Sequence, residues 1–115
     1  MTASIVLYKN DKKILLESIN SFLSSDTKEN LYLYLIDNSP TDELKDLIVH
    51  PKVEYISNQS NPGFGAAHNI AIKNALKLDS RYHLVLNPDV YFETNTIDLL
   101  LKFMNDHPNV GNVMP

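Results

Sequence analysis

The sequence predicts an α/β protein with a mostly parallel sheet covered by helices on both faces. Short apolar runs alternate along the chain with segments in which apolar residues recur at helical spacing. Turn-forming Asn, Asp, Pro, Gly and Ser residues separate most of these runs and segments. Such alternation is typical of βαβ units with right-handed crossovers, so we expect three layers, helix, sheet and helix.

The strands are expected at four short runs. The first is apolar almost throughout, which indicates burial on both faces, and the third is the weakest. The four runs are Ala3–Tyr8, Leu31–Ile36, Val53–Ser57 and Tyr82–Leu86. Residues 110–115 resemble the start of another strand, so we expect a single domain, residues 1–115, that is a piece of a longer protein.

The helices are expected between these strands. Leu15, Ile19 and Phe22 form the apolar stripe of the first, which Asn10 or Asp11 can cap. A short second helix should follow Thr41 and end at His50, because the residue before a proline avoids helical geometry. The last two are expected at about Ala66–Leu78 and Asn95–Asp106.

Composition excludes several classes of protein. Ten basic and fourteen acidic residues give a net charge of -4, and no basic patch of the kind that binds nucleic acid is visible. Cysteine is absent, which excludes disulfides and thiolate metal sites. No signal peptide or transmembrane run is recognisable. We expect a cytoplasmic protein, with a peripheral position at the inner membrane as the alternative.

The residues after each strand are the candidates for chemistry, because open α/β sheets bind ligands at the carboxyl ends of their strands. Tyr8 and Asn10 follow the first strand, and Asp37 and Asn38 follow the second. Asp37 can accept hydrogen bonds from a ribose or a base at the rim of a crevice. It can equally initiate a turn by bonding the backbone of the residue two positions on, and position alone leaves both interpretations open.

The loop after the third strand ends in Gly63-Phe64-Gly65 at the start of a helix. Free N–H groups at a helix N-terminus favour anions, and glycine lets a ligand approach the backbone. The loop is not a Walker loop and is a poor dinucleotide fingerprint, because His68 stands in place of the third glycine. A turn that starts a helix is an equal alternative, and His68 or Asn69 could reach a ligand there.

Asn87-Pro88-Asp89 after the fourth strand is the sharpest feature. A carboxylate at a strand tip can hold Mg²⁺ or Mn²⁺ while diphosphate oxygens complete the coordination shell. The alternative is an ordinary Asn-Pro-Asp turn. The remaining histidines, His50, His83 and His107, are interpreted as structural or exposed.

Four motifs in order resemble the N-terminal half of family 2 glycosyltransferases with the GT-A fold. They are Ser4-Ile5-Val6-Leu7-Tyr8, Ile36-Asp37-Asn38-Ser39, Asn61-Pro62-Gly63-Phe64-Gly65-Ala66-Ala67-His68-Asn69 and Leu84-Val85-Leu86-Asn87-Pro88-Asp89-Val90. The third and fourth are most similar to the rhamnosyltransferase branch. The resemblance implies a truncated Rossmann-like GT-A sheet with strand order 3-2-1-4.

The resemblance also implies roles for residues and ligands. The donor would be a nucleotide-diphosphate sugar, with dTDP-rhamnose as one candidate, and the acceptor a saccharide or glycolipid. Asp89 matches the last acid of the family's Asp-x-Asp metal motif, whereas Asn87 replaces the first, which leaves dependence on Mg²⁺ or Mn²⁺ open. The residues implied to bind the nucleotide sugar are Tyr8, Asn10, Asp37, Asn38, Asn61, Gly63, Phe64, Asn69 and Asn87. The base that activates the acceptor is expected beyond residue 115, so the catalytic residues are unassigned and this piece alone should be inactive.

Other classes fit the residues less well. A nucleotidyltransferase would carry a glycine-rich basic loop after the first strand, where Lys9-Asn10-Asp11-Lys12 has no glycine. A non-catalytic nucleotide-binding module of the flavodoxin or response-regulator type remains the alternative, although the acidic cluster expected there is missing. An incomplete parallel sheet has an open edge, so we also expect self-association.

Overall fold

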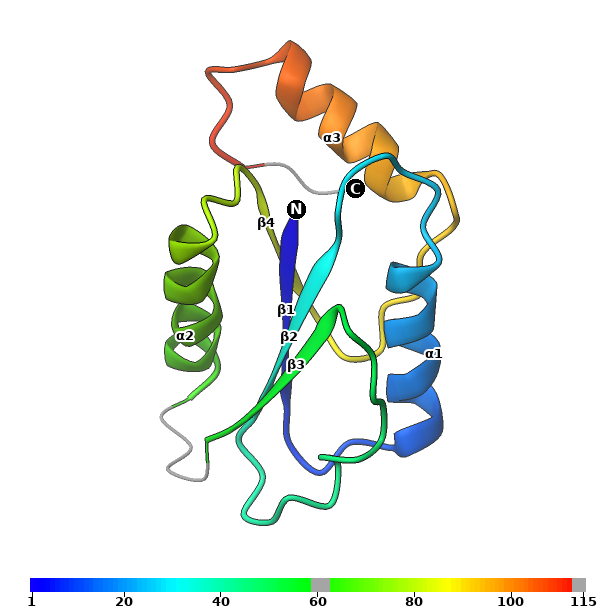
Figure 1. Cartoon of the computed structure of the whole chain (residues 1–115), viewed down its shortest axis with the longest axis vertical. Coiled ribbons are helices and arrows are strands. Elements are labelled where there is room, and N and C mark those ends of the chain that lie inside the picture. The colour runs from blue at the N-terminus through cyan, green and yellow to red at the C-terminus, as the bar shows by residue number, and fades with distance from the viewer. Residues whose placement is uncertain (59–62, 113–115) are drawn as a thin grey trace.

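The computed structural model describes residues 1–58 and 63–112, and all structural statements below concern these residues. They form a four-stranded sheet flanked by helices (Figure 1). The elements in chain order are β1 (Thr2–Leu7), α1 (Lys12–Leu23), β2 (Tyr32–Asp37), β3 (Val53–Ser57), α2 (Phe64–Lys77), β4 (His83–Leu86) and α3 (Thr96–Asp106).

The sheet is parallel throughout, in the order β3-β2-β1-β4, which confirms the predicted order. Its register aligns Val53, Leu33, Ala3 and Leu84 in one row across the strands. Parallel strands all end at the same edge, so this register brings the four predicted strand tips to one end of the molecule.

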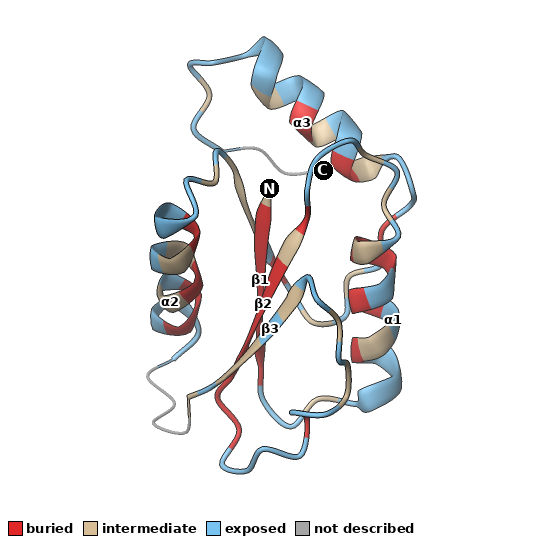
Figure 2. Ribbon diagram, in the orientation of Figure 1, coloured by how far each residue is buried: buried red, intermediate tan, exposed pale blue. Residues whose placement is uncertain are grey.

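The helices cover both faces of the sheet, as the predicted three layers require (Figure 1). α2 packs on one face, against a small cluster that includes Val6, Ile36 and Ala67. α1 and α3 contribute to the larger core on the other face, which includes Ile5, Phe22 and Ile97 among others. β1 and most of β2 are buried on both faces (Figure 2), which is why their sequences are nearly continuous apolar runs.

Asp11 caps α1, one of the two caps that the sequence allowed. Its Oδ1 accepts a hydrogen bond from the N–H of Ile14 at 3.0 Å, which satisfies one of the unpaired donors of the first turn. Of the helices in the described part of the chain, none has the length and apolar character that crossing a bilayer requires.

Three expected elements differ in the structure. The helix predicted after Thr41 is wrong: residues 41–50 are irregular apart from turns at residues 43–46, with bonds from Lys45 N–H to Asp42 O and from Leu47 N–H to Leu44 O. One buried side chain, Leu44, anchors this segment, and so short a stretch gains too few hydrogen bonds to offset helix nucleation.

The other two differences are the start of α2 and the strand expected at residues 110–115. α2 begins at Phe64 rather than Ala66, because Gly63 adopts φ +99°, a left-handed conformation that suits glycine, and serves as the N-cap. Residues 110–112 are not in a strand, contrary to expectation, and residues 113–115 lie outside the described part.

Candidate functional site

Hydrogen bonds join the tips of β1, β2 and β3 at the carboxyl edge of the sheet. The N–H of Lys9 donates to Ser39 Oγ at 2.8 Å, and the N–H of Asn38 donates to Leu7 O at 2.9 Å. From β3, Asn58 donates through its backbone to Asp37 O at 2.7 Å and through Nδ2 to Asn38 Oδ1 at 3.0 Å. The predicted convergence of these three strand ends is therefore confirmed.

Asp37 is 1% exposed, and both of its carboxylate oxygens are used inside the protein. Oδ1 accepts from the N–H of Ser39 at 2.9 Å, which is the turn bond that the sequence allowed as an alternative role. Oδ2 accepts from the Tyr55 hydroxyl, and this bond adds to burial in raising the pKa of Tyr55. Asp37 thus holds the end of β2 and the β3 tyrosine in place; the buried Asn38 holds Asn58.

Tyr8 and Asn10 form the rim beside this rigid edge. The Tyr8 ring is 52% exposed, and its own N–H donates to Asn10 Oδ1 at 2.7 Å. The Lys9 ammonium lies 5.4 Å from the centre of the Tyr8 ring, within cation–π range. An exposed aromatic face with a cation above it is a suitable surface for a flat, electron-rich or anionic ligand.

Asn10 lies between two hollows at this edge. One, of about 430 Å³, is lined by Asn10 and Asp11 on one side and by Asn87, Pro88 and Asp89 on the other. The second, of about 320 Å³, runs from Asn10 to Ser39 and the turn that follows β2. The structure therefore brings Asn10, Asn87 and Asp89 together, and places Asp37 at the same edge but buried behind Ser39.

The glycine-rich loop begins α2 at the same end of the sheet (Figure 1). Gly63 is exposed and has no side chain with which to cap this helix, so within the described residues the first backbone N–H groups of α2 receive no side-chain cap from their N-cap residue. Phe64 is 51% exposed and meets the His68 ring edge-on, with ring centres 4.4 Å apart. Asn69 is exposed, and Asn61 lies outside the described residues.

Oxygen donors predominate in the hollow beside Asp89. Asp89 and Asn87 are exposed, and with Asn10 and Asp11 they offer carboxylate and amide oxygens, the ligands that Mg²⁺ and Mn²⁺ prefer. Across residues 1–58 and 63–112, however, no three His, Asp or Glu side chains are grouped as a ready-made metal site. The donor set fits a cation that takes part of its shell from a bound diphosphate.

A partly buried chain of hydroxyl and imidazole groups was not predicted from the sequence. Ser4 Oγ contacts His68 Nδ1 at 2.7 Å and His83 Nε2 at 2.8 Å, and His83 Nδ1 contacts Thr2 Oγ1 at 2.8 Å. Thr2 continues to Ser80 Oγ, which donates to Tyr82 O. Thr2 and Ser4 are two residues apart on β1, so both side chains point to the sheet face that α2 covers. This spacing of two hydroxyl residues in an apolar strand was the sequence feature that could have indicated the hydrogen-bonded chain.

Because each hydroxyl carries one proton, the donor in each of these hydrogen bonds can be identified. Because Ser80 donates to Tyr82 O and Thr2 donates to Ser80, His83 must donate from Nδ1, and Ser4 must donate to the bare His83 Nε2. His68 then donates from Nδ1 to Ser4, which leaves its buried Nε2 as an acceptor without a partner in the described part of the chain.

Both imidazoles are held neutral. Burial lowers the pKa of His68, and burial together with the neighbouring His68 lowers the pKa of His83 to about 4.

Comparisons with known proteins identify the family. A profile described as glycosyl transferase family 2 matches residues 4–115. An uncharacterized glycosyltransferase of Rickettsia conorii is 31% identical over 96 residues, which is 80% of this chain and 15% of that protein. The low-salt glycan biosynthesis hexosyltransferase Agl10 of Haloferax volcanii is 31% identical over 90 residues, 70% of this chain and 29% of that protein.

Solved structures agree on the fold. TarS of S. aureus superimposes with a TM-score of 0.71 at 17% identity, covering 99% of this chain and 23% of TarS. TarS 1–349 in complex with UDP-GlcNAc gives a TM-score of 0.66 at 18% identity, covering 100% of this chain and 37% of that one. The chain thus spans less than a third of the two curated relatives' length. Its sequence and its sheet together place it in glycosyl transferase family 2.

Proposed function

We propose that this chain is the donor-binding part of a glycosyltransferase that transfers a sugar from a nucleoside diphosphate to a saccharide or glycolipid acceptor. The observation that carries the proposal is the meeting of three strand tips and the Asp89 hollow around Asn10, in a chain of this family. A nucleoside diphosphate is long enough to need both hollows, and Asn10 lies where they meet.

Each end of the donor has candidate partners. The Tyr8 ring offers a surface for the base, and the second hollow, beside Ser39 and the turn after Asp37, suits the ribose. Asp37 supports the second hollow through its hydrogen bonds with Ser39 and Tyr55. Direct contact between Asp37 and the ligand would require one of these two hydrogen bonds to break. On the strength of the family resemblance we assign Gly63, Phe64 and Asn69, at the start of α2, to the same site, together with Asn38 and Asn61; Asn61 lies outside the described residues.

Asp89 is the proposed ligand of a divalent cation, with Asn87 and Asn10 as neutral oxygen donors beside it. When bound, Mg²⁺ or Mn²⁺ would neutralise the charge that builds on the departing diphosphate. The protein's own residues orient the donor here, while the base that takes the acceptor proton lies outside the assigned residues. We therefore expect this chain by itself to bind the donor without transferring the sugar.

The sugar and the nucleotide of the donor are the next properties to determine. The TarS neighbour is solved with UDP-GlcNAc, and the two motifs around Gly63 and Asp89 resemble rhamnosyltransferases, so UDP-GlcNAc and dTDP-rhamnose are the two donors to compare first. We place the reaction on the cytoplasmic side of the membrane, where an inverting transfer would extend a polysaccharide or glycolipid.

Calorimetric titration with UDP and dTDP, with and without Mn²⁺, tests the proposal. Asn10→Ala should weaken nucleoside diphosphate binding about tenfold whether or not metal is present, whereas Asp89→Asn should abolish the enhancement by Mn²⁺. Asp106→Asn, an exposed acid at the end of α3, is the matched control and should bind as the wild type does. Binding that is absent, or that neither variant changes, would contradict the proposal.

A response-regulator role is disfavoured by the state of Asp37. Phosphoryl transfer to this carboxylate needs an accessible oxygen, whereas Asp37 is buried with both oxygens bonded. Acyl-phosphate labelling of Asp37 would reverse this conclusion.

A further inference from the structure

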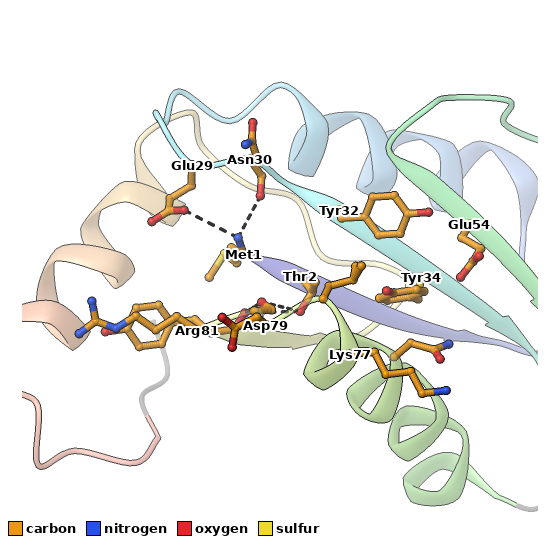
Figure 3. Close-up of a pocket in the computed structure, with 14 residues that line it drawn as sticks. Met1, Thr2, Glu29, Asn30, Tyr32, Tyr34, Glu54, Lys77, Asp79 and Arg81 are labelled. Carbon is orange, nitrogen blue, oxygen red and sulfur yellow. Dashed lines mark hydrogen bonds and ion pairs between the residues drawn. The ribbon is translucent and has the colours of Figure 1, made fainter.

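A groove of about 720 Å³ lies at the end of the sheet opposite the candidate donor site. It is bounded on one side by Tyr32, Tyr34 and Glu54 of β2 and β3, and on the other by Lys77 of α2 (Figure 3). Asn74 of α2 also lines it. A six-residue strand is about 20 Å long, so the groove and the donor site are separate places on the molecule.

The groove presents polar groups that the described part of the chain leaves without partners. The hydroxyls of Tyr32 and Tyr34, the Glu54 carboxylate, the Asn74 amide and the Lys77 ammonium form no hydrogen bond or ion pair within residues 1–58 and 63–112. Donors and acceptors therefore occur on both walls. A surface of this kind binds a ligand that itself carries both donors and acceptors.

The charges of the groove favour an uncharged ligand. Glu54 and Asp79 are balanced by Lys77 and Arg81, and the carboxylate of Glu29 lies 3.8 Å from the amine of Met1. A polyanion or polycation would meet equal numbers of like and opposite charges. Burial and the charge of Glu54 raise the pKa of both tyrosines, so their hydroxyls remain protonated and can donate.

The groove also has an aromatic wall. Tyr32 is half-buried and meets Tyr34 edge-on, with ring centres 5.2 Å apart, so Tyr34 fixes the orientation of the Tyr32 ring. A fixed ring beside carboxylate and amide groups matches a sugar, whose C–H face is apolar and whose rim carries hydroxyls. Phosphate or nucleotide ligands would require an excess of positive charge that the groove lacks.

We propose that this groove binds a short uncharged saccharide, with the Tyr32 ring against a sugar face and Glu54, Asn74 and Lys77 bonded to its hydroxyls. The inference rests on the proposed function in one respect: the saccharide would be a distal portion of the glycan being extended. It adds a second binding site, remote from the donor site, that would hold a long acceptor on the protein between transfers.

NMR titration of the full chain with neutral oligosaccharides, chitotriose, maltotriose and a rhamnose disaccharide, tests this site. At least one should shift the backbone amide signals of the β2 and α2 residues that line the groove. Tyr32→Phe should weaken binding about threefold, because it keeps the ring but removes the hydroxyl, and Glu54→Gln about tenfold, because it replaces a charged acceptor with a neutral amide of nearly the same size. The exposed pair Tyr91→Phe and Glu93→Gln is the matched control and should leave binding unchanged.

The same samples separate this inference from the proposed function. Groove variants should leave nucleoside diphosphate binding unchanged, and Asn10→Ala should leave saccharide binding unchanged. Three results would each overturn the inference: no binding of any of these saccharides in the millimolar range, shifts confined to residues outside the groove, or equal weakening in the control variants. Loss of nucleotide binding with saccharide binding intact would instead overturn only the proposed function.

Discussion

Lowering the pH should destabilise this protein through His83. Burial and the neighbouring His68 depress the pKa of His83 from 6.5 to about 4. Since the folded state disfavours the charged form, the unfolded chain binds the proton more tightly, and stability is complete above pH 6.5 and falls toward pH 4. The full shift corresponds to about 3 kcal/mol of unfolding free energy, of which about 2 kcal/mol is lost by pH 5.

The hydrogen-bond chain explains why the loss should be so large. A proton on His83 Nε2 turns the acceptor of the Ser4 hydroxyl into a second donor. Ser4 Oγ would then receive N–H groups from His83 and His68 at once, and its own proton would need a new acceptor inside the core. The depressed pKa of His68 acts in the same direction, because its burial also penalises charge.

Urea unfolding at pH 8, 6 and 5 measures the effect. The wild type should lose about 2 kcal/mol between the extremes, and His83→Gln, which can donate and accept but does not titrate, should lose much less. His107→Gln replaces an exposed histidine and should keep the wild-type slope. If His83→Gln and the wild type lose stability in parallel, or if neither changes above pH 5, the assigned network is not what holds His83 neutral.

Three further predictions concern other parts of the molecule. Asp11→Ala should lower the unfolding free energy by about 1 kcal/mol in urea titrations, because it removes the α1 cap, and unchanged stability would contradict the cap. Asn87→Asp should increase the Mn²⁺ dependence of nucleoside diphosphate binding in calorimetry, since it adds a second carboxylate beside Asp89; equal binding with and without metal would refute this. Val85 is 51% exposed on β4, an edge strand of the sheet and the edge through which we expect self-association. Val85→Lys should therefore shift sedimentation profiles toward monomer, and a wild type that is monomeric at high concentration would exclude self-association.

The strands were predictable because each is a short, largely apolar run with turn residues nearby, and β1 and β2 are also buried. β1 and β2 were placed within one residue, since burial on both faces leaves few polar residues within either run. The order of the strands came from the family resemblance, because local sequence does not determine which strands are neighbours. The segment after Thr41 shows the limit of periodicity, since three apolar residues at helical spacing fit a packed turn as well as a helix.

The candidate site, like the fold, was predictable from the sequence only in part. Strand tips could be located from the sequence, and parallel pairing then brought them together. The hydrogen bond between Asp37 and Tyr55 was not predictable, because Tyr55 lies 18 residues away on a neighbouring strand. The histidine chain was missed for a similar reason, because its contacts with Ser4 span 64 and 79 residues.

Ser4 must act simultaneously as donor and acceptor at the centre of the sheet, and this dual requirement restricts how the position can evolve. Threonine has the same hydroxyl, whereas alanine would strand two imidazole nitrogens in the interior and valine would add bulk without a bond. Among descendants of this sequence, an apolar residue at position 4 should therefore be found with other side chains in place of His68 and His83. The three positions should change as a set, although none of them is assigned to the donor pocket.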